Sequence, residues 1–215
     1  MEEPVKAAPG RRERKALATR RRVLDAAETL FVHVGYAATT ITAIAEAADV
    51  AVPTVYAVFG TKRAILTELL DVRIVGDDGQ APLRDREDWR AMDRETDPRG
   101  QLALLAAIST RISNRISALY EVMAAAAGSD PEIAAMYRER QQARHADQQV
   151  LARSLARRGA LRSGLREARA TDIIWALANP RTHHSLVAER RWSADEYQRW
   201  LADLLASALL REPAG

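Results

Sequence analysis

The sequence of 215 residues contains no cysteine, which excludes disulfides, thiol nucleophiles and cysteine-ligated zinc sites. It has only two phenylalanines and few stretches of alternating apolar and polar residues, so β-strands are not expected. Its apolar runs, such as 102–108 and the mostly alanine 122–127, are too short to cross a bilayer. The first 22 residues lead into no apolar block of the signal-peptide type. These absences predict a cytoplasmic protein without a membrane partner.

Motifs of the common enzyme classes are missing as well. The ten glycines form no G-x-G pair, no Walker loop and no G-x-S-x-G elbow. No H-E-x-x-H motif occurs, and on a helix the adjacent His183 and His184 would point about 100° apart, so they cannot bind one metal from one face. We therefore predict no catalytic residues, no metal site and no cofactor.

The total charge is nearly balanced, but the charges are unevenly distributed along the sequence. The chain has 32 Lys and Arg and 29 Asp and Glu, which gives a net charge of +3. Residues 1–22 alone contain eight basic and three acidic side chains. Such a segment suits a phosphate backbone, although a solvated tail has the same composition. We expect residues 1–16 to form a flexible basic arm.

The residues that do abound are helix formers, arranged in apolar patterns of three- and four-residue spacing. They predict an all-α protein of about nine helices. Ser193 with Glu196 fits a capping box at the start of the last helix, and Trp192 with Tyr197 fits a hydrophobic staple. The expected helices are about 16–34, 41–48, 51–59, one from Thr61 to about 75, a short one around Trp89, 98–127, 131–158, 167–178, 180–190 and 194–211.

Two short helices in tandem between residues 40 and 59 carry the functional signal. A helix, a tight turn and a second helix within about 20 residues form a helix-turn-helix, whose second helix enters the major groove of DNA. Val55 and Phe59 face back toward the first helix, and the outer face is left for contacts. A unit this small cannot bury its own apolar face, so the flanking helices are needed.

A longer pattern surrounds this motif, without a gap, over some 40 residues. It consists of Val23–Leu24–Asp25–Ala26–Ala27, Leu30–Phe31, Gly35–Tyr36, Thr39–Thr40, Ile44–Ala45, Ala48–Asp49–Val50, Thr54–Val55–Tyr56, Phe59 and Thr61–Lys62. In this order and spacing, residues 17–77 resemble the DNA-binding domain of the TetR family of regulators. The C-terminal half is similar, less specifically, to the ligand-binding domain of one branch of the family through 172–177, 179–180 and Trp192–Ser193.

The resemblance implies double-stranded operator DNA as a partner and assigns phosphate contacts to named residues. Tyr56 would donate a hydrogen bond to phosphate, and Lys62 would act as a point charge. Thr40 and Thr42, at the start of the first short helix, are placed for phosphate with help from the helix N-terminus. One of the arginines 20–22, or the arm before them, could reach the minor groove.

Base contacts fall on the start of the second short helix. Thr54 can reach phosphate or a base edge, and Val52 and Pro53 can contact thymine methyl groups. Many family members have a polar residue where Ala51 stands and an aromatic or histidine where Ala57 stands. We therefore expect few hydrogen bonds to bases and more weight on phosphate and DNA shape.

The second half is expected to hold a small-molecule pocket and a dimer interface. Polar side chains near an apolar stripe suggest the pocket, although a solvated face or plain core would look the same. The predicted pocket residues are Ile112, Arg115, Leu119, Tyr120, Met123, Tyr137, Gln141 and Trp175. The apolar stripe of the last helix is wider than one core face requires, and the resemblance implies a four-helix dimer bundle. The predicted interface residues are His183, Val187, Tyr197, Trp200, Leu201, Leu204 and Leu205, with burial in a monomer core as the alternative.

These inferences predict five segments: the arm 1–16, a helix-turn-helix domain 17–77 with its motif at 40–59, a linker 78–97, an effector-binding and dimerisation domain 98–211 and a tail 212–215. As a homodimer the protein would read a palindrome. By resemblance its usual action is repression relieved by a small-molecule effector, although activation also occurs in the family. Two alternatives stay open: a helical ligand-binding dimer that has lost specific DNA binding, and a helical enzyme with a scattered site.

Overall fold

The computed structural model describes residues 10–76 and 86–211. Apart from one isolated bridge between Leu161 and Leu210, the regular elements of these residues are all helices. The predicted all-α class is therefore confirmed. The chain divides into two compact units, Met1–Leu70 and Asp71–Gly215 (unit 1 and unit 2 below). The division falls inside a helix and earlier than the predicted boundary at 77, and the predicted tail 212–215 lies outside the described residues.

Unit 1 consists of α1 (Arg11–Val34), α2 (Ile41–Ala47), α3 (Val52–Phe59) and most of α4 (Lys62–Val75). Their ends follow the local signals. Gly35 ends α1 at φ 89°, and Gly60 ends α3 at φ 73°. Asp49 adopts φ 52° in the tight turn between α2 and α3, a left-handed conformation that aspartate tolerates. The buried core of the unit includes Val23, Ala27, Phe31, Ile44, Ala45, Val55, Phe59, Ile65, Leu66 and Leu69.

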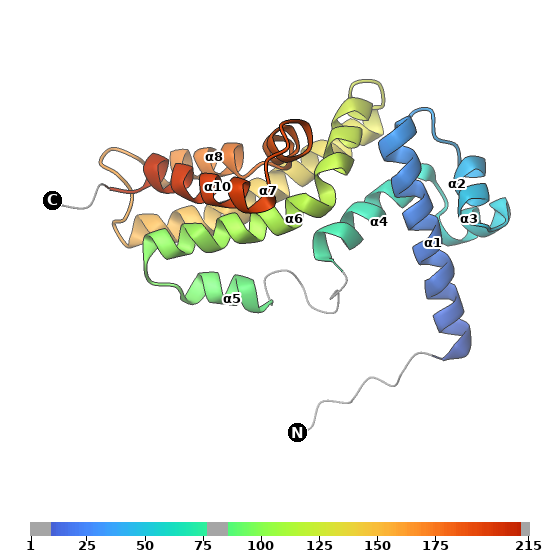
Figure 1. Cartoon of the computed structure of the whole chain (residues 1–215), viewed down its shortest axis with the longest axis horizontal. Helices are drawn as coiled ribbons and strands as arrows, with labels where there is room; N and C mark the ends of the chain where they lie inside the picture. The colour runs from blue at the N-terminus through green and yellow to red at the C-terminus, as the bar shows by residue number, and fades with distance from the viewer. Residues whose placement is uncertain (1–9, 77–85, 212–215) are drawn as a thin grey trace. The chain divides into compact units, whose positions relative to one another are not determined.

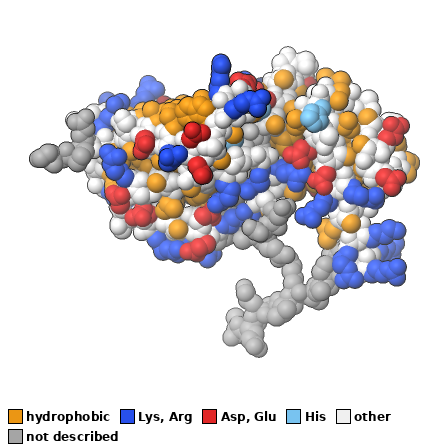
Figure 2. Space-filling view, viewed as in Figure 1, with side chains coloured by type: hydrophobic (Ala, Val, Ile, Leu, Met, Phe, Trp, Pro, Cys, Tyr) orange, Lys and Arg blue, Asp and Glu red, His pale blue; other side chains and the backbone are white. Residues whose placement is uncertain are grey.

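Helix α1 begins earlier than expected. Residues 11–16 were predicted to belong to a flexible arm, and this prediction is wrong because they form the first turns of α1. Arginine, lysine and alanine all favour helix, which explains the extension. The side chains of Arg11, Arg12 and Lys15 are exposed there, and Figure 2 shows cations gathered at this end of the helix. Residues 1–9 of the predicted arm lie outside the described residues.

Unit 2 contains the last turn of α4 and the remaining helices. These are α5 (Glu87–Arg94), α6 (Pro98–Ala127), α7 (Pro131–Arg157), α8 (Glu167–Leu177), α9 (Pro180–His183), the π-helical turn η2 (His184–Glu189) and α10 (Ala194–Leu209). Asp97 and Asp130 cap α6 and α7, and the predicted capping box of Ser193 and Glu196 is present at α10. The single helix expected at 180–190 is instead α9 followed by the wider turn η2. Helix α5 lies within the predicted linker 78–97, whose residues 78–85 are outside the described part.

Four long helices of unit 2 pack around a shared core. Helices α6 and α7 lie side by side, α10 packs on α6, and α8 packs on α7 (Figure 1). Trp89 and Met92 bury α5 against the same core, so this helix belongs to unit 2. Within residues 10–76 and 86–211 no single helix is long and apolar enough to span a membrane; α2 and α3 meet that test only as a pair bent by 109°.

Several residues predicted at a dimer interface are buried inside unit 2 instead. Tyr197, Leu201 and Leu205 are at most 1% exposed, and His183 is 2% exposed. These four predictions are wrong, because a side chain already enclosed by its own chain has no surface to offer a partner. They lie on α9 and α10, which both pack on α6, whereas periodicity alone does not tell the inner side of a wide apolar stripe from the outer side. Val187, Trp200 and Leu204 are half-buried and stay predictions.

His183 is neutral in its buried position. Its Nε2 lies 2.8 Å from Oδ1 of Asn114, and its ring stands edge-on to Tyr197 at 4.8 Å between centroids. Burial, with a smaller contribution from His184, lowers the pKa of His183 to about 4. The imidazole therefore stays uncharged in the folded protein down to this pH, and its Nε2–H donates to Asn114.

Acidification is expected to destabilise unit 2 through this residue. The unfolded imidazole takes up a proton near pH 6.5, whereas the folded one resists until about pH 4, so falling pH favours the unfolded state across this window. Between pH 7 and pH 4.5 the free energy of unfolding should fall by about 2.5 kcal/mol more in the protein than in His183→Gln. Urea unfolding of both proteins measures the difference, in which the titrating carboxylates cancel. Equal losses in the two proteins would contradict the prediction.

Candidate functional site

The outer face of the helix-turn-helix is formed by the first residues of α2 and by α3. Thr40 caps α2 by accepting a hydrogen bond from the Ala43 amide at 3.0 Å. Of the residues predicted to contact DNA, Thr40, Thr42, Pro53 and Tyr56 are exposed, and Tyr56 is 54% exposed in spite of its size. An exposed tyrosine on a short helix contributes little to the core, so its hydroxyl and ring are available to a partner.

Two further predicted contacts are half-buried on the same two-helix unit. Val52 and Thr54 lie in the first turn of α3, which starts at Ala51 without a side-chain cap. Val55 and Phe59 are buried beneath them, as the pattern predicted. The structure therefore brings six of the seven predicted DNA-contact residues together on one small motif, where contact with DNA stays a prediction, and Lys62 is the exception.

Lys62 is engaged inside unit 1. Its ammonium donates to the carbonyl oxygens of Tyr36 at 2.7 Å, Thr39 at 2.8 Å and Ala37 at 3.4 Å, and it lies 4.4 Å from the centroid of the Tyr36 ring. These contacts join the first turn of α4 to the loop that leads into Thr40. Lys62 thus positions the start of α2, a role that the sequence did not suggest because it depends on residues some 25 positions away.

Two of the three arginines considered for the minor groove turn back onto unit 1. Arg20 forms an ion pair with Glu68, and its guanidinium lies 5.0 Å from the centroid of the Phe59 ring. Arg22 lies 3.5 Å from the carbonyl oxygen of Asp49, at the turn between α2 and α3. Both side chains stabilise the frame of the motif, and the exposed cations nearer the start of α1 are better placed to meet a phosphate backbone.

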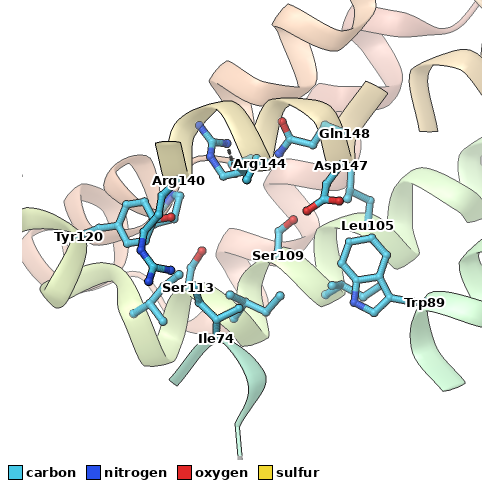
Figure 3. Close-up of a pocket in the computed structure, with 16 residues that line it drawn as sticks. Ile74, Trp89, Leu105, Ser109, Ser113, Tyr120, Arg140, Arg144, Asp147 and Gln148 are labelled. Carbon is cyan, nitrogen blue, oxygen red and sulfur yellow. Dashed lines mark hydrogen bonds between the residues drawn. The ribbon is translucent and has the colours of Figure 1, made fainter. Parts of the chain in front are cut away.

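Unit 2 contains a cavity of about 180 Å³ between α6 and α7 (Figure 3). Its walls are mainly apolar side chains of α6, closed by Ile74 at the end of α4 and by Trp89 of α5. The polar lining comes chiefly from one face of α7. The full set of lining residues is Ile74, Trp89, Leu105, Ile108, Ser109, Ile112, Ser113, Ile116, Tyr120, Arg140, Ala143, Arg144, Asp147, Gln148, Ala178 and Pro180.

Arg144 lines the cavity and is held by three hydrogen bonds and one aromatic contact. Its Nη1 donates to the carbonyl oxygens of Trp175 at 2.8 Å and Ala178 at 3.1 Å, at the C-terminal end of α8, and its Nε donates to Oε1 of Gln141 at 3.1 Å. The guanidinium also lies 4.9 Å from the centroid of the Trp175 ring. Burial lowers the pKa of Arg144 to about 10, so it is cationic at neutral pH.

A second cation and a phenol lie near Arg144. Arg140 donates from Nη2 to Oδ1 of Asp71 at 2.8 Å, and Asp71 is largely exposed. Burial raises the pKa of Tyr120, an effect that the nearby Arg144 and Arg140 partly offset, so its hydroxyl remains protonated. Figure 3 places Tyr120, Arg140 and Ser113 at one end of the cavity and Trp89, Asp147 and Gln148 at the other.

The predicted pocket residues separate into three groups. Ile112 and Tyr120 line the cavity, whereas Leu119 and Met123 are at most 1% exposed and do not line it. Arg115 does not line it either, because its guanidinium donates to the carbonyl oxygens of Arg73 at 2.7 Å and Ile74 at 3.0 Å and so caps the C-terminal end of α4.

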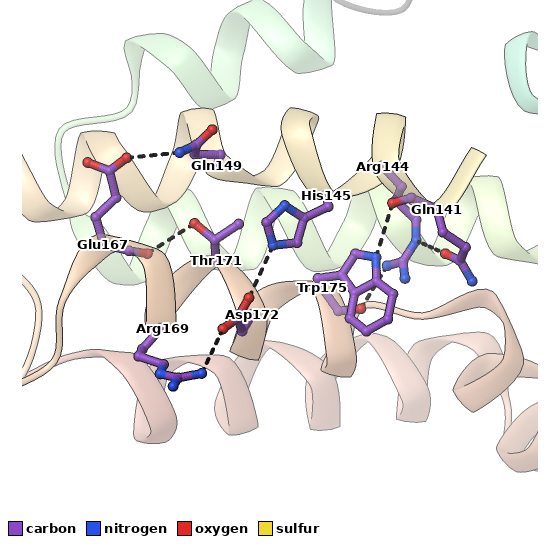
Figure 4. Close-up of polar contacts among 9 residues, drawn as sticks. All are labelled: Gln141, Arg144, His145, Gln149, Glu167, Arg169, Thr171, Asp172 and Trp175. Atoms are coloured by element: carbon purple, nitrogen blue, oxygen red, sulfur yellow. Dashed lines mark hydrogen bonds and ion pairs between the residues drawn. The ribbon is translucent and has the colours of Figure 1, made fainter. Parts of the chain in front are cut away.

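Tyr137, Gln141 and Trp175 form the third group and lie behind Arg144, outside the cavity lining. Gln141 donates to the Tyr137 hydroxyl at 2.8 Å, and the indole N–H of Trp175 donates to the Gln141 carbonyl oxygen at 3.3 Å. Gln141 and Trp175 belong to a chain of polar contacts that joins α7 to α8 (Figure 4). Further along, His145 pairs with Asp172 at 3.1 Å and lowers the pKa of that carboxyl.

Sequence reasoning missed most of the polar lining of the cavity. Arg140, Arg144 and Gln148 follow each other at four-residue spacing, and Asp147 lies three residues after Arg144, which places these four polar residues on one face of α7. This spacing of polar residues, on a helix that follows one with a continuous apolar stripe, was the sequence signal that could have indicated the lining.

Comparisons with known proteins support the division into two units. The family model of bacterial regulatory proteins, tetR family, matches residues 23–69. No curated protein matches the chain.

Solved structures similar to this chain cover both units. NalD of Pseudomonas aeruginosa, described as the secondary repressor of the MexAB-OprM multidrug efflux pump, has 22% identity and a TM-score of 0.68 over 92% of this chain and 99% of its own. FadR of Bacillus subtilis in complex with stearoyl-CoA has 18% identity and a TM-score of 0.66 over 87% and 98%. A Saccharomonospora viridis protein in complex with choline has 19% identity and a TM-score of 0.67 over 90% and 98%. At these identities the likeness shows a shared fold.

Proposed function

Because this chain is a TetR-family transcriptional regulator, with a helix-turn-helix in residues 23–69 and a helical C-terminal domain, we propose that it represses transcription as a homodimer on a palindromic operator. A small-molecule effector that enters the cavity of unit 2 would release it. The observation that carries the proposal is the exposed outer face of α2 and α3 within the segment that matches the family model.

The proposed DNA contacts combine one apolar patch with several phosphate donors. Val52 and Pro53 at the start of α3 would contact thymine methyl groups, and Thr54 would contact phosphate or a base edge. Tyr56, Thr40 and Thr42 would contact phosphate around them, while Lys62 holds the loop that leads into Thr40. Few side chains of α3 can make paired hydrogen bonds to a base, so DNA shape should contribute much of the specificity.

The proposed release depends on the last turn of α4. Ile74 lines the cavity, Asp71 pairs with Arg140, and Arg115 holds the final carbonyl groups of the helix. The same helix begins at Lys62, which positions the start of α2. An effector that binds best when α4 is displaced would favour a conformation that does not bind DNA.

The proposed dimer uses the apolar surface of η2 and α10, the last two helical segments of unit 2. Val187, Trp200 and Leu204 are half-buried, so each leaves apolar surface for a partner. The ring of Trp200 lies 5.8 Å from that of Trp192 and 5.6 Å from that of Tyr197, which fixes its position on α10.

Selection of the full-length protein on random duplex DNA tests the proposal. We expect enrichment of a palindrome whose half-sites lie about one helical turn apart or a multiple of it, with an affinity that falls steeply as salt rises. Failure to enrich any sequence, together with salt-independent behaviour, would instead favour a ligand-binding dimer that has lost DNA binding.

A further inference from the structure

The cavity contains a buried cation with unused hydrogen-bond donors. A guanidinium has five N–H groups, and three of those of Arg144 donate to Trp175, Ala178 and Gln141. The two on Nη2 are buried without a partner, and no carboxylate of the described residues pairs with Arg144. A buried donor without an acceptor destabilises the folded protein, so an acceptor from a ligand would bind favourably here.

The charge of the lining favours an anion. Its ionised side chains are Arg140, Arg144 and Asp147, and Arg140 is paired with Asp71. The cation of Arg144 is balanced only in part by the carbonyl oxygens at the end of α8. A negative charge placed against Arg144 would therefore be compensated, and a positive charge there would be repelled.

A second unpartnered group lies one helical turn further along α7. Oε1 of Gln148 is buried without a hydrogen-bond partner. A carboxamide can be turned so that either its oxygen or its NH₂ group faces the cavity. In the second orientation Gln148 and Arg144 would offer donors to the same ligand from one face of α7.

The size and walls of the cavity limit the rest of the ligand. A cavity of about 180 Å³ is slightly larger than an engineered apolar cavity of about 150 Å³ that accepts benzene. Leu105, Ile108, Ile112 and Ile116 form apolar walls on α6. These walls suit one flat ring or a short branched chain.

We propose that the effector site of the proposed function binds a small carboxylate with a flat apolar body about the size of benzoate. Its carboxylate accepts from Nη2 of Arg144, with Arg140 and Tyr120 close by, and its ring lies between the isoleucines of α6 and the face of α7. The regulatory role of this ligand rests on the proposed function, whereas its binding to the cavity does not depend on DNA.

Calorimetric titration of the full-length protein with sodium benzoate tests the proposal. Benzamide has nearly the same shape without the charge, benzyltrimethylammonium reverses the charge, and inorganic phosphate has charge without the ring. At constant ionic strength we expect benzoate to bind about tenfold or more tightly than each of them, because charge-assisted hydrogen bonds are about twice as strong as neutral ones. Equal affinities for benzoate and benzamide, or no benzoate binding up to its solubility limit, would overturn the proposal.

Three variants separate the guanidinium from general effects of charge. Arg144→Gln should abolish the preference for benzoate over benzamide. Arg140→Gln should reduce it and is the milder change, because Arg140 pairs with the exposed Asp71 rather than with the end of α8. Arg153→Gln is the matched control, since it removes an arginine from the same helix that pairs with Glu167 and does not line the cavity. A preference that survives both cavity substitutions in folded protein would refute the assignment.

DNA binding measured on the same preparations keeps this proposal apart from the proposed function. If the protein binds a palindrome but shows no preference for benzoate, the proposed carboxylate site is wrong and the proposed regulator function is retained. If benzoate binds through Arg144 but the protein enriches no DNA sequence, the carboxylate site stands and the operator proposal fails.

Discussion

Tyr56→Glu is expected to lower operator affinity by about a hundredfold or more. The substitution removes a phosphate donor and places a negative charge against the DNA backbone, and a dimer would have two such sites. Tyr56→Phe removes only the hydroxyl and should cost about tenfold, the value of one hydrogen bond to a charged group. Because the side chain is 54% exposed, neither change should affect the free energy of unfolding.

Electrophoretic mobility shifts on the selected operator measure both variants. Val150→Glu is the matched control, because it puts the same charge in place of an exposed apolar side chain on α7 of unit 2. If Tyr56→Glu and Val150→Glu weaken binding equally, only the net charge matters, and the assignment of α3 to the DNA surface fails. A loss confined to Tyr56→Glu would also exclude a ligand-binding dimer without DNA function.

Local features were predictable because their causes lie within a few residues. Asp97 and Asp130 before proline, the Ser193–Glu196 box and the glycines after α1 and α3 satisfy or terminate helix ends by themselves. The position of the helix-turn-helix followed from the same signals and from the buried pair Val55 and Phe59. Even the left-handed turn at Asp49 is a property of that residue type.

Features that depend on distant partners were not predictable. Lys62 and Arg115 both look like cations for a ligand, but each is occupied by backbone carbonyl groups brought to it by the fold. The polar side chains of α7 could equally have formed a solvated face, but Arg144 among them is buried and bonded to the carbonyl groups at the C-terminal end of α8. In each case the sequence shows the charge and the fold decides which groups surround it.

The wide apolar stripe of α10 also shows that the sequence does not reveal which side chains are buried by distant parts of the chain. A helical period predicts that residues 200–205 are apolar on one side, and it does not say which of them meet their own chain. The structure separates two neighbours, since Leu205 is fully buried and Leu204 is half-buried. This pair allows one substitution to be compared at two sites that differ by a single position.

Leu205→Ala is expected to reduce the free energy of unfolding of unit 2 by about 3–4 kcal/mol, through lost burial and the cavity left in the core. Leu204→Ala should cost far less in the folded subunit and should instead weaken the proposed dimer by about tenfold or more, since each interface would lose two leucine side chains. Urea unfolding measures the first effect, and sedimentation over a dilution series measures the second. Because a dimer is stabilised by concentration, the unfolding experiments should be run at several protein concentrations.

If the effects of the two substitutions were reversed, the dimer interface would have to be assigned to another surface. If Leu205→Ala dissociated the dimer while leaving the subunit stable, the buried side of α10 would be the side that meets the partner, and the core of unit 2 would have to open to form it. A dimer insensitive to Leu204→Ala would place the interface away from this part of α10. Since two reading helices can meet two half-sites only when the subunits are held at a fixed spacing, either result would also change the operator geometry expected from selection.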